Sequence, residues 1–415
     1  MLAWTRGICA TRSVNELGIE SQSQLFYNIT YYFFTHFTLT MNTFFTASLR
    51  RALLAGSFLL AHVASALYAQ SALRAVPVQV PPAQKYKAVA ERIVATATAD
   101  SVLYKRRGEE VKVPHWVRGE ESCTLVLPRT KNIAMLGLGG SIATPPEGIT
   151  ADVVVMSSFD ELKARSTEVR SKIVLFDVPF TEYGKTVAYR VQGAVEAARY
   201  GAVGSLVRSV GPYSIYTPHT GAMYYNDSIP KIPHAAISIE DAEMIHRMVQ
   251  RKQQVRITLK MSGKWEPDAV SRNIMFEIPG SEKPNEIVVM SGHIDSWDVG
   301  QGAMDDGGGC FAAWHALNTI KKLGLKPKRT IRVVMYTNEE NGLRGGKHYA
   351  ASHDKEVHVL GIESDEGTFK PQGFHHEGSK ESLLWYQSLA PLLSPIGATT
   401  IVEGFAGADI GPLKA

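Results

Sequence analysis

Residues 287–298 read Ile-Val-Val-Met-Ser-Gly-His-Ile-Asp-Ser-Trp-Asp, and residues 330–340 read Thr-Ile-Arg-Val-Val-Met-Tyr-Thr-Asn-Glu-Glu. Each stretch begins with an apolar, β-branched run, which is typical of a buried strand, and ends in polar residues. Between them, residues 307–324 end at a glycine and carry apolar side chains at helical spacing, at Ala313, Ala316, Leu317, Ile320 and Leu323. Strand, helix and strand in this order predict a βαβ unit with parallel strands.

A third apolar run, residues 357–362, also ends in acidic residues. Because ligands gather beyond the carboxyl ends of parallel strands, the polar side chains there should meet at one edge of the sheet. The side chains at or near these three ends are His293, Asp295, Asp305, Glu339, Glu340 and Asp365. Carboxylates around an imidazole suit zinc or a similar divalent ion, so we predict a metal centre.

Each of these motifs alone has an ordinary structural explanation. A histidine after a strand is usually a hydrogen-bonded surface group, and paired glutamates such as Glu339 and Glu340 usually face water. The sequence Asp305-Asp306 before three glycines is also compatible with a simple helix cap. Their coincidence at successive strand ends is what favours the metal centre.

Four motifs together resemble the co-catalytic di-zinc exopeptidases. They are His293-x-Asp295, Gly302-Ala303-Met304-Asp305-Asp306, Asn338-Glu339-Glu340-x-Gly342-Leu343 and Glu363-Ser364-Asp365. The resemblance extends from about Tyr86 to the end of the chain. It implies an α/β fold with a mostly parallel sheet flanked by helices.

The resemblance also implies a role for each site residue and two zinc ions in a complete subunit. His293 and Asp365 would bind one zinc ion, Asp305 would bridge both ions, and Glu340 would bind the other. Glu339 would act as the general base, and Asp295 would orient His293. The implied activity is hydrolysis of small peptides, most of all dipeptides, from a free end by a water that two metal ions activate.

Two alternatives to an active enzyme remain open at this point. One is a non-catalytic binding protein or receptor ectodomain on the same fold, and the other is a catalytically impaired fragment. In the resembling family the second zinc takes its last ligand from a histidine downstream of residues 407–412, and no residue of this chain stands there. Counting ligands for each ion, we expect the 415-residue chain to hold about one zinc ion and to be nearly inactive.

The composition argues against a nucleic-acid-binding protein and against a disulfide-stabilised one. Hydrophobic residues make up 45% of the chain and charged residues 20%, as in ordinary soluble globular proteins. The net charge of +4 arises from 44 basic and 40 acidic residues without long runs, which argues against nucleic acid as a partner. Three cysteines cannot form a disulfide framework, and Cys310, at the start of the predicted helix, is expected to be a packed residue.

The first 66 residues predict export. Residues 1–40 form a doubtful leader, and residues 41–66 combine a basic pair, a short apolar run and an Ala-Ser-Ala site, which is typical of a signal peptide. The apolar run is too short for a stable membrane anchor. We therefore expect passage through the ER and Golgi to a secreted or lysosomal destination, with Asn226-Asp227-Ser228 as a glycosylation acceptor.

The rest of the chain divides into three parts. Residues 67–143 are expected to hold an N-terminal helix at 86–104, with a pro-segment before it, and the first strands of the catalytic domain. The Gly-rich residues 137–141, continued by the Pro-containing residues 144–148, are interpreted as a hinge. Residues 144–255 resemble a protease-associated domain: a β-rich insert with short strands near 153–155, 173–176 and 204–207. Residues 256–415 would form the catalytic domain.

Three further residues are candidate substrate contacts. His375 and His376 follow the third strand, and neighbours on an extended segment face opposite ways, so we expect loop or substrate contacts there and not shared metal binding. Asp409 lies in a segment that resembles a family loop near the substrate pocket. The resemblance also suggests a homodimer, in addition to the small peptide substrate.

Overall fold

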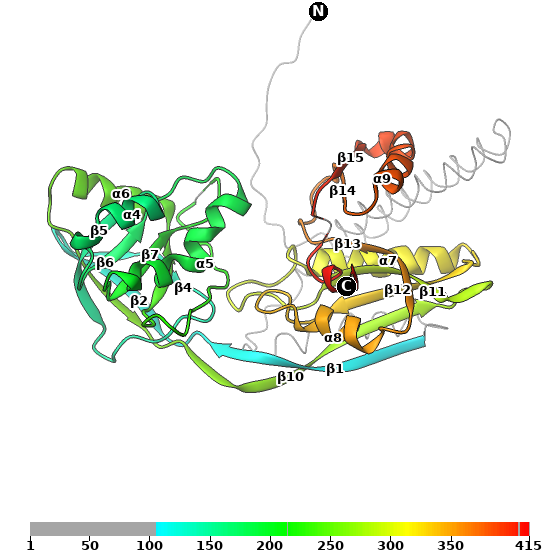
Figure 1. The fold of residues 1–415 in the computed structure, drawn as a ribbon, viewed down its shortest axis with the longest axis horizontal. Coiled ribbons are helices and arrows are strands. Elements are labelled where there is room, and N and C mark those ends of the chain that lie inside the picture. The colour runs from blue at the N-terminus through cyan, green and yellow to red at the C-terminus, as the bar shows by residue number, and fades with distance from the viewer. Residues whose placement is uncertain (1–104, 214, 406, 415) are drawn as a thin grey trace, which may run out of the picture.

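The computed structural model describes residues 105–213, 215–405 and 407–414. Their strands form a five-stranded, an eight-stranded and a two-stranded sheet. Figure 1 shows the two larger sheets at opposite sides of the molecule, connected by the long strands β1 (Lys105–Val117) and β10 (Lys264–Ile278). We call the five-stranded sheet with its helices the first unit, and the eight-stranded sheet with its helices the second unit.

The first unit has the strand order β1-β10-β12-β11-β13, with β11 at Lys283–His293, β12 at Arg329–Tyr336 and β13 at Val357–Glu363. Strand β11 is parallel to both β12 and β13, as predicted, so their carboxyl ends lie together. Strand β10 is antiparallel to both of its neighbours, β1 and β12, so the sheet is mixed, with β10 opposite in direction to the other four strands. The local sequence does not encode this direction, because β1 and β10 pair across more than 140 residues.

One helix covers each face of this sheet (Figure 1): α7 (Gly307–Lys322) and α8 (Arg344–Ser352). Alternate residues of β12 supply the two cores, since Val333 and Met335 pack with α7, and Val334 and Tyr336 pack with Tyr349 of α8. The predicted helical stripe is confirmed, except that Leu323 is 45% exposed just beyond the helix. Cys310 is fully buried in the α7 core, as expected.

The second unit has the strand order β3-β2-β9-β5-β6-β7-β8-β4. The strands are β2 (Glu121–Leu127), β3 (Lys131–Ile133), β4 (Met135–Gly137), β5 (Ile149–Met156), β6 (Ile173–Phe176), β7 (Gly204–Arg208), β8 (His234–Ile237) and β9 (Arg256–Met261). Strands β5 to β8 are parallel. The connecting helices are α4 (Phe159–Ala164), η1 (Ser166–Glu168), α5 (Tyr183–Arg199) and α6 (Ile239–Gln250), so the unit is α/β and more helical than a β-rich insert.

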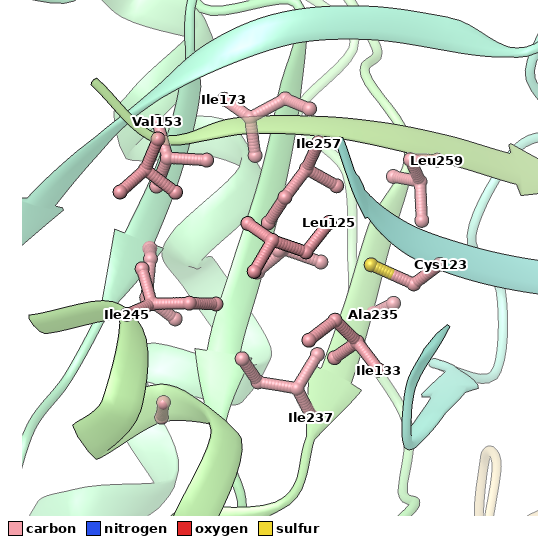
Figure 2. Close-up of a cluster of buried hydrophobic side chains, with 14 of the residues drawn as sticks. Cys123, Leu125, Ile133, Val153, Ile173, Ala235, Ile237, Ile245, Ile257 and Leu259 are labelled. Atoms are coloured by element: carbon pink, nitrogen blue, oxygen red, sulfur yellow. The ribbon is translucent and has the colours of Figure 1, made fainter. Parts of the chain in front are cut away.

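Apolar side chains fill both faces of this second sheet. Figure 2 shows one face, where Leu125, Ile257 and Leu259 from the antiparallel strands pack with Ile237 and with Ile245 of α6. The strands expected near 153–155, 173–176 and 204–207 are confirmed within β5, β6 and β7. Burial stabilises β6 in particular, since all four of its residues are fully buried.

The boundary between the units differs from the one predicted. Strands β2 and β3, which we expected in the catalytic domain, pair with β9 and belong to the second unit. The predicted hinge also lies inside this unit, because Leu138 is fully buried and Gly139 forms a bridge with Ala222. Local composition cannot predict strand pairing between segments that lie so far apart in the sequence.

The remaining described elements follow β13. Strands β14 (Gly373–His376) and β15 (Thr400–Glu403) are parallel, and they flank α9 (Lys380–Gln387) and η2 (Ala390–Ile396) in the sequence; η3 (Gly411–Lys414) follows. Within the described ranges, no helix is both long and apolar enough to cross a membrane. The predicted leader, signal peptide and helix at 86–104 lie outside the described residues.

Candidate metal centre

His293 is the last residue of β11 and occupies the centre of the site. Its side chain is 1% exposed, and its Nε2 lies 3.0 Å from Oδ1 of Asp305 and 3.1 Å from Oδ1 of Asp365. Its Nδ1 lies 3.0 Å from the main-chain oxygen of Asp295. In a neutral ring the hydrogen bond to this carbonyl would keep the proton on Nδ1, so that Nε2 would be the atom free to bind a metal ion.

The Asp306 side chain accepts a hydrogen bond from the main chain of His293. The sequence predicted no role for Asp306 beyond a possible helix cap. It is the N-cap of α7, and Oδ1 of its 1%-exposed side chain accepts a hydrogen bond of 3.0 Å from the Gly309 N–H. Oδ2 accepts the His293 N–H at 3.0 Å. The same carboxylate therefore starts the helix and holds the end of β11, and the Asp-Gly-Gly-Gly sequence was the available signal for the cap.

Glu339 and Glu340 enter the site from a tight turn after β12. The turn begins at Asn338, whose φ of 64° lies in the left-handed region that asparagine tolerates. The Asp295 carboxylate accepts the Glu339 N–H at 3.0 Å and the Glu340 N–H at 3.3 Å. Asp295 was predicted to orient His293. Its main-chain oxygen contacts the ring, its carboxylate Oδ1 lies 3.6 Å from Nδ1 of the same ring, and that carboxylate also holds the glutamate turn.

Two groups of three side chains have ligand atoms within 4.8 Å of one another, and His293 belongs to both. One group contains Asp305 and Glu340, and the other contains Glu339 and Asp365. The three parallel strand ends thus bring together the metal-site residues predicted from the sequence. Carboxylates with one imidazole form a donor set that fits zinc. Since both glutamates are within reach, the division of roles between Glu339 and Glu340 stays a prediction.

The electrostatics of the cluster also fit a divalent cation. Burial is the largest cause that raises the pKa of Glu339 to about 7 and the pKa of Glu340 to about 8; the neighbouring carboxylates also raise both pKa values, and the His293 charge lowers them. Carboxylates this close repel one another unless protons or a cation neutralise them. A dication between them removes the repulsion that raises these pKa values.

Behind the cluster, Asp409 is the most unusual carboxylate of the described residues. Its side chain is completely buried, and neither of its carboxylate oxygens has a hydrogen-bond partner in the described part of the chain. Glu363, the last residue of β13, accepts the N–H groups of Ala408, Asp409 and Ile410 at 2.9–3.2 Å. These bonds fix the Asp409 segment to the strand that carries Asp365. Burial, with the nearby Glu363 charge, raises the pKa of Asp409 to about 9.

Asp409 should make the metal-free protein less stable as pH rises. Its folded-state pKa lies above the unfolded value of about 4, so between the two the folded protein binds the extra proton, and stability present at low pH is lost toward pH 9. Asp409→Asn should reduce this slope by up to about 1.4 kcal/mol per pH unit. Urea unfolding with chelator at pH 5 and pH 8 measures it, with the exposed Asp268→Asn as the control. Equal slopes in all three proteins would contradict the expectation.

The other predicted contacts lie outside the two metal groups. His375 and His376 are on β14, where His376 Nε2 is 3.0 Å from the Ser382 hydroxyl and His375 is half exposed. Asn226 is exposed, and its Oδ1 accepts the Ser228 N–H at 2.9 Å in a local turn. Accessibility at Asn226 is compatible with glycosylation, which stays a prediction.

Comparison with known proteins gives two kinds of relatives. Residues 273–409 match the model of peptidase family M28. Carboxypeptidase Q from Xenopus laevis is 53% identical over 73% of this chain, and carboxypeptidase Q from Homo sapiens is 51% identical over 74%. The chain spans 65% and 66% of the length of these two relatives.

Solved structures agree in fold. The peptidase M28 precursor from Shewanella amazonensis SB2B has a TM-score of 0.80 and 30% identity, covering 88% of this chain and 86% of its own. A zinc aminopeptidase from Bacillus subtilis has a TM-score of 0.59 over 85% of this chain and 81% of its own, at 18% identity. That second likeness concerns the fold alone.

Proposed function

The chain belongs to peptidase family M28, and on that basis we propose that it is a zinc-dependent exopeptidase that hydrolyses small peptides, with dipeptides as the preferred class. The observation that carries the proposal is the convergence of His293, Asp305, Asp365 and the two glutamates at adjacent strand ends. A further support is the similarity to proteins named carboxypeptidase Q.

Each side chain has a chemical task in this proposal. Zinc, when bound, polarises the scissile carbonyl and lowers the pKa of a water molecule. Glu339 accepts the proton of the attacking water and passes it to the leaving amine nitrogen, so the C–N bond breaks without releasing an unprotonated amine anion. Asp295 holds both glutamates through their main-chain N–H groups, and Asp306 holds His293.

The two groups contain five different side chains, which is more than one four-coordinate zinc ion takes and supports a site for two zinc ions in a complete subunit. A carboxylate must lie between two dications that are about 3.5–4 Å apart. Asp305, on the loop before α7, is the residue that we assign to this place. The non-catalytic binding protein is not favoured, because the base and the ligands occur together.

The proposal is tested with purified protein and a set of matched dipeptides. One dipeptide has both ends free, a second carries an N-terminal acetyl group, and a third carries a C-terminal amide. Hydrolysis of the free dipeptide with loss of activity in chelator, and its return with zinc, supports a zinc exopeptidase. Activity toward only one blocked form identifies which free end is required. Zinc binding without hydrolysis of any dipeptide would overturn the proposal of an active peptidase, in favour of a binding protein or a catalytically impaired fragment.

We also propose a place for the protein in the secretory pathway, with delivery outside the cell or to lysosomes. The support is the signal-like sequence at residues 41–66 together with the exposed acceptor Asn226. Secreted material should begin near Leu67 and carry an Asn226 glycan that Asn226→Gln removes. Recovery of the uncleaved, unglycosylated chain in the cytosol would contradict this. A homodimer remains the proposed assembly.

A further inference from the structure

The loop at residues 294–306 carries two residues of the metal centre, Asp295 near its start and Asp305 near its end. It connects β11 to α7 without regular secondary structure, and Asp305 at its far end is 63% exposed. Conformational entropy opposes the ordering of the backbone at every residue of such a loop. The position of Asp305 therefore depends on what anchors the part of the loop between the two aspartates.

One anchor is the ion pair between Asp298 of the loop and Arg118, which lies between β1 of the first unit and β2 of the second unit. Arg118 follows β1 and donates from Nε to Oδ2 of Asp298 at 2.8 Å and from Nη2 to Oδ1 at 2.8 Å. The two side chains are 9% and 25% exposed, so the pair is largely shielded from water. A bidentate pair fixes both the distance and the orientation of the carboxylate, which an ammonium group cannot do.

Arg118 is itself held firmly at the junction of the two units. Its Nη1 donates to the Gly137 carbonyl of β4, and its Nη2 lies 3.3 Å from the Thr220 hydroxyl. Its guanidinium also lies 5.2 Å from the centre of the Trp116 ring. The arginine therefore connects the loop to two separate segments of the second unit.

The second anchor is the contact of Trp297 with Gly139. A Cβ atom at residue 139 would lie 2.1 Å from the Trp297 ring, so the indole rests directly on the glycine backbone. That backbone is rigid, because the Gly139 N–H donates to Gly221 at 2.9 Å and its carbonyl accepts from Met223 at 2.9 Å. The adjacent loop residues Trp297 and Asp298 thus contact Gly139 and Arg118, respectively.

We propose that Arg118 is a positioning residue for the metal centre, which acts through Asp298 to keep the loop in place and Asp305 within ligand distance of His293. The inference rests on the proposed function for the identity of the metal. It assigns the second unit a role in building the centre, although Arg118 contributes no ligand to it. Outer residues that orient ligands typically affect metal affinity 10–100-fold.

The test compares Arg118→Lys and Asp298→Asn with the unsubstituted chain. Arg118→Lys keeps the charge and loses the bidentate geometry, so zinc affinity should fall about 10-fold in competition with a chromophoric chelator. In the metal-free proteins, hydrogen exchange of a peptide covering residues 294–306 should accelerate. Combining the two substitutions should cost no more than either alone, because both break one interaction.

Arg165→Lys is the matched control. Arg165 forms a similar two-bonded pair with Glu168, at 3.0 and 2.8 Å, within the second unit and away from this loop. It should leave zinc affinity and loop exchange unchanged. If Arg118→Lys and Asp298→Asn also leave both unchanged in folded protein, Arg118 has no positioning role. If the unsubstituted chain binds no zinc, the proposed metal is wrong, and loop exchange alone then decides the role of Arg118.

Discussion

Replacing Glu339 by glutamine is expected to lower dipeptide turnover by about 10²–10⁴-fold while zinc remains bound. Glutamine keeps the size of the side chain and cannot take up a proton, so the water and the leaving amine lose their proton carrier. Substrate binding should change little, because the substitution removes the proton transfer in the chemical step and no contact that binds the substrate. Turnover number and zinc content, measured on the same preparation, separate these effects.

The adjacent residue supplies the control. Glu340→Gln has the same chemical change one residue along the same turn, where Asp295 also accepts the main-chain N–H. Because Glu340 is assigned to metal binding, this substitution should lower zinc affinity first and turnover as a consequence. Excess zinc should then restore activity to Glu340→Gln and not to Glu339→Gln. If excess zinc restored activity to Glu339→Gln and not to Glu340→Gln, Glu340 would be the base and Glu339 the metal ligand. Such an exchange is possible because each glutamate has a ligand atom within 4.8 Å of one on His293.

The core of the site was predictable because it depends on local patterns. Three apolar runs end in polar residues, and a helix separates the first two, which predicts parallel strands. The structure confirms that β11 is parallel to β12 and β13, so the carboxyl ends of the three strands lie together. The helix cap Asp306 was also visible in the Asp-Gly-Gly-Gly sequence. What local pattern could not show is that this cap also receives the His293 N–H.

Other features depend on contacts between residues far apart in the chain. Arg118 and Asp298 are separated by 180 residues, and neither lies in a motif that suggests a pair. The pairing of β2 with β9 likewise moved residues 121–133 into the second unit. Glycine-rich residues 137–141 were interpreted as a hinge, whereas Gly139 lacks a side chain because Trp297 lies against it. Composition cannot distinguish a flexible glycine from one required by close packing.

His293→Ala is expected to have the largest effect on metal binding of any single substitution. The imidazole is the one residue common to both groups of ligand atoms and the one nitrogen ligand in them, and its side chain is 1% exposed. Loss of an outer partner already costs 10–100-fold in metal affinity. Removal of the His293 imidazole should therefore lower zinc affinity by more than about 100-fold and abolish peptide hydrolysis.

The matched control is His348→Ala, which removes a histidine from α8 that contacts Ser352 at 3.3 Å and belongs to neither group. It should retain zinc and activity. Zinc content after dialysis, titration with a competing chelator, and thermal unfolding with and without zinc are measured on both variants. Zinc should raise the melting temperature of His348→Ala and leave that of His293→Ala unchanged, because only a folded protein that binds the ion is stabilised by it. Tight zinc binding by His293→Ala would mean that the carboxylates alone hold the ion, and the assignment of the imidazole as a zinc ligand would then be wrong.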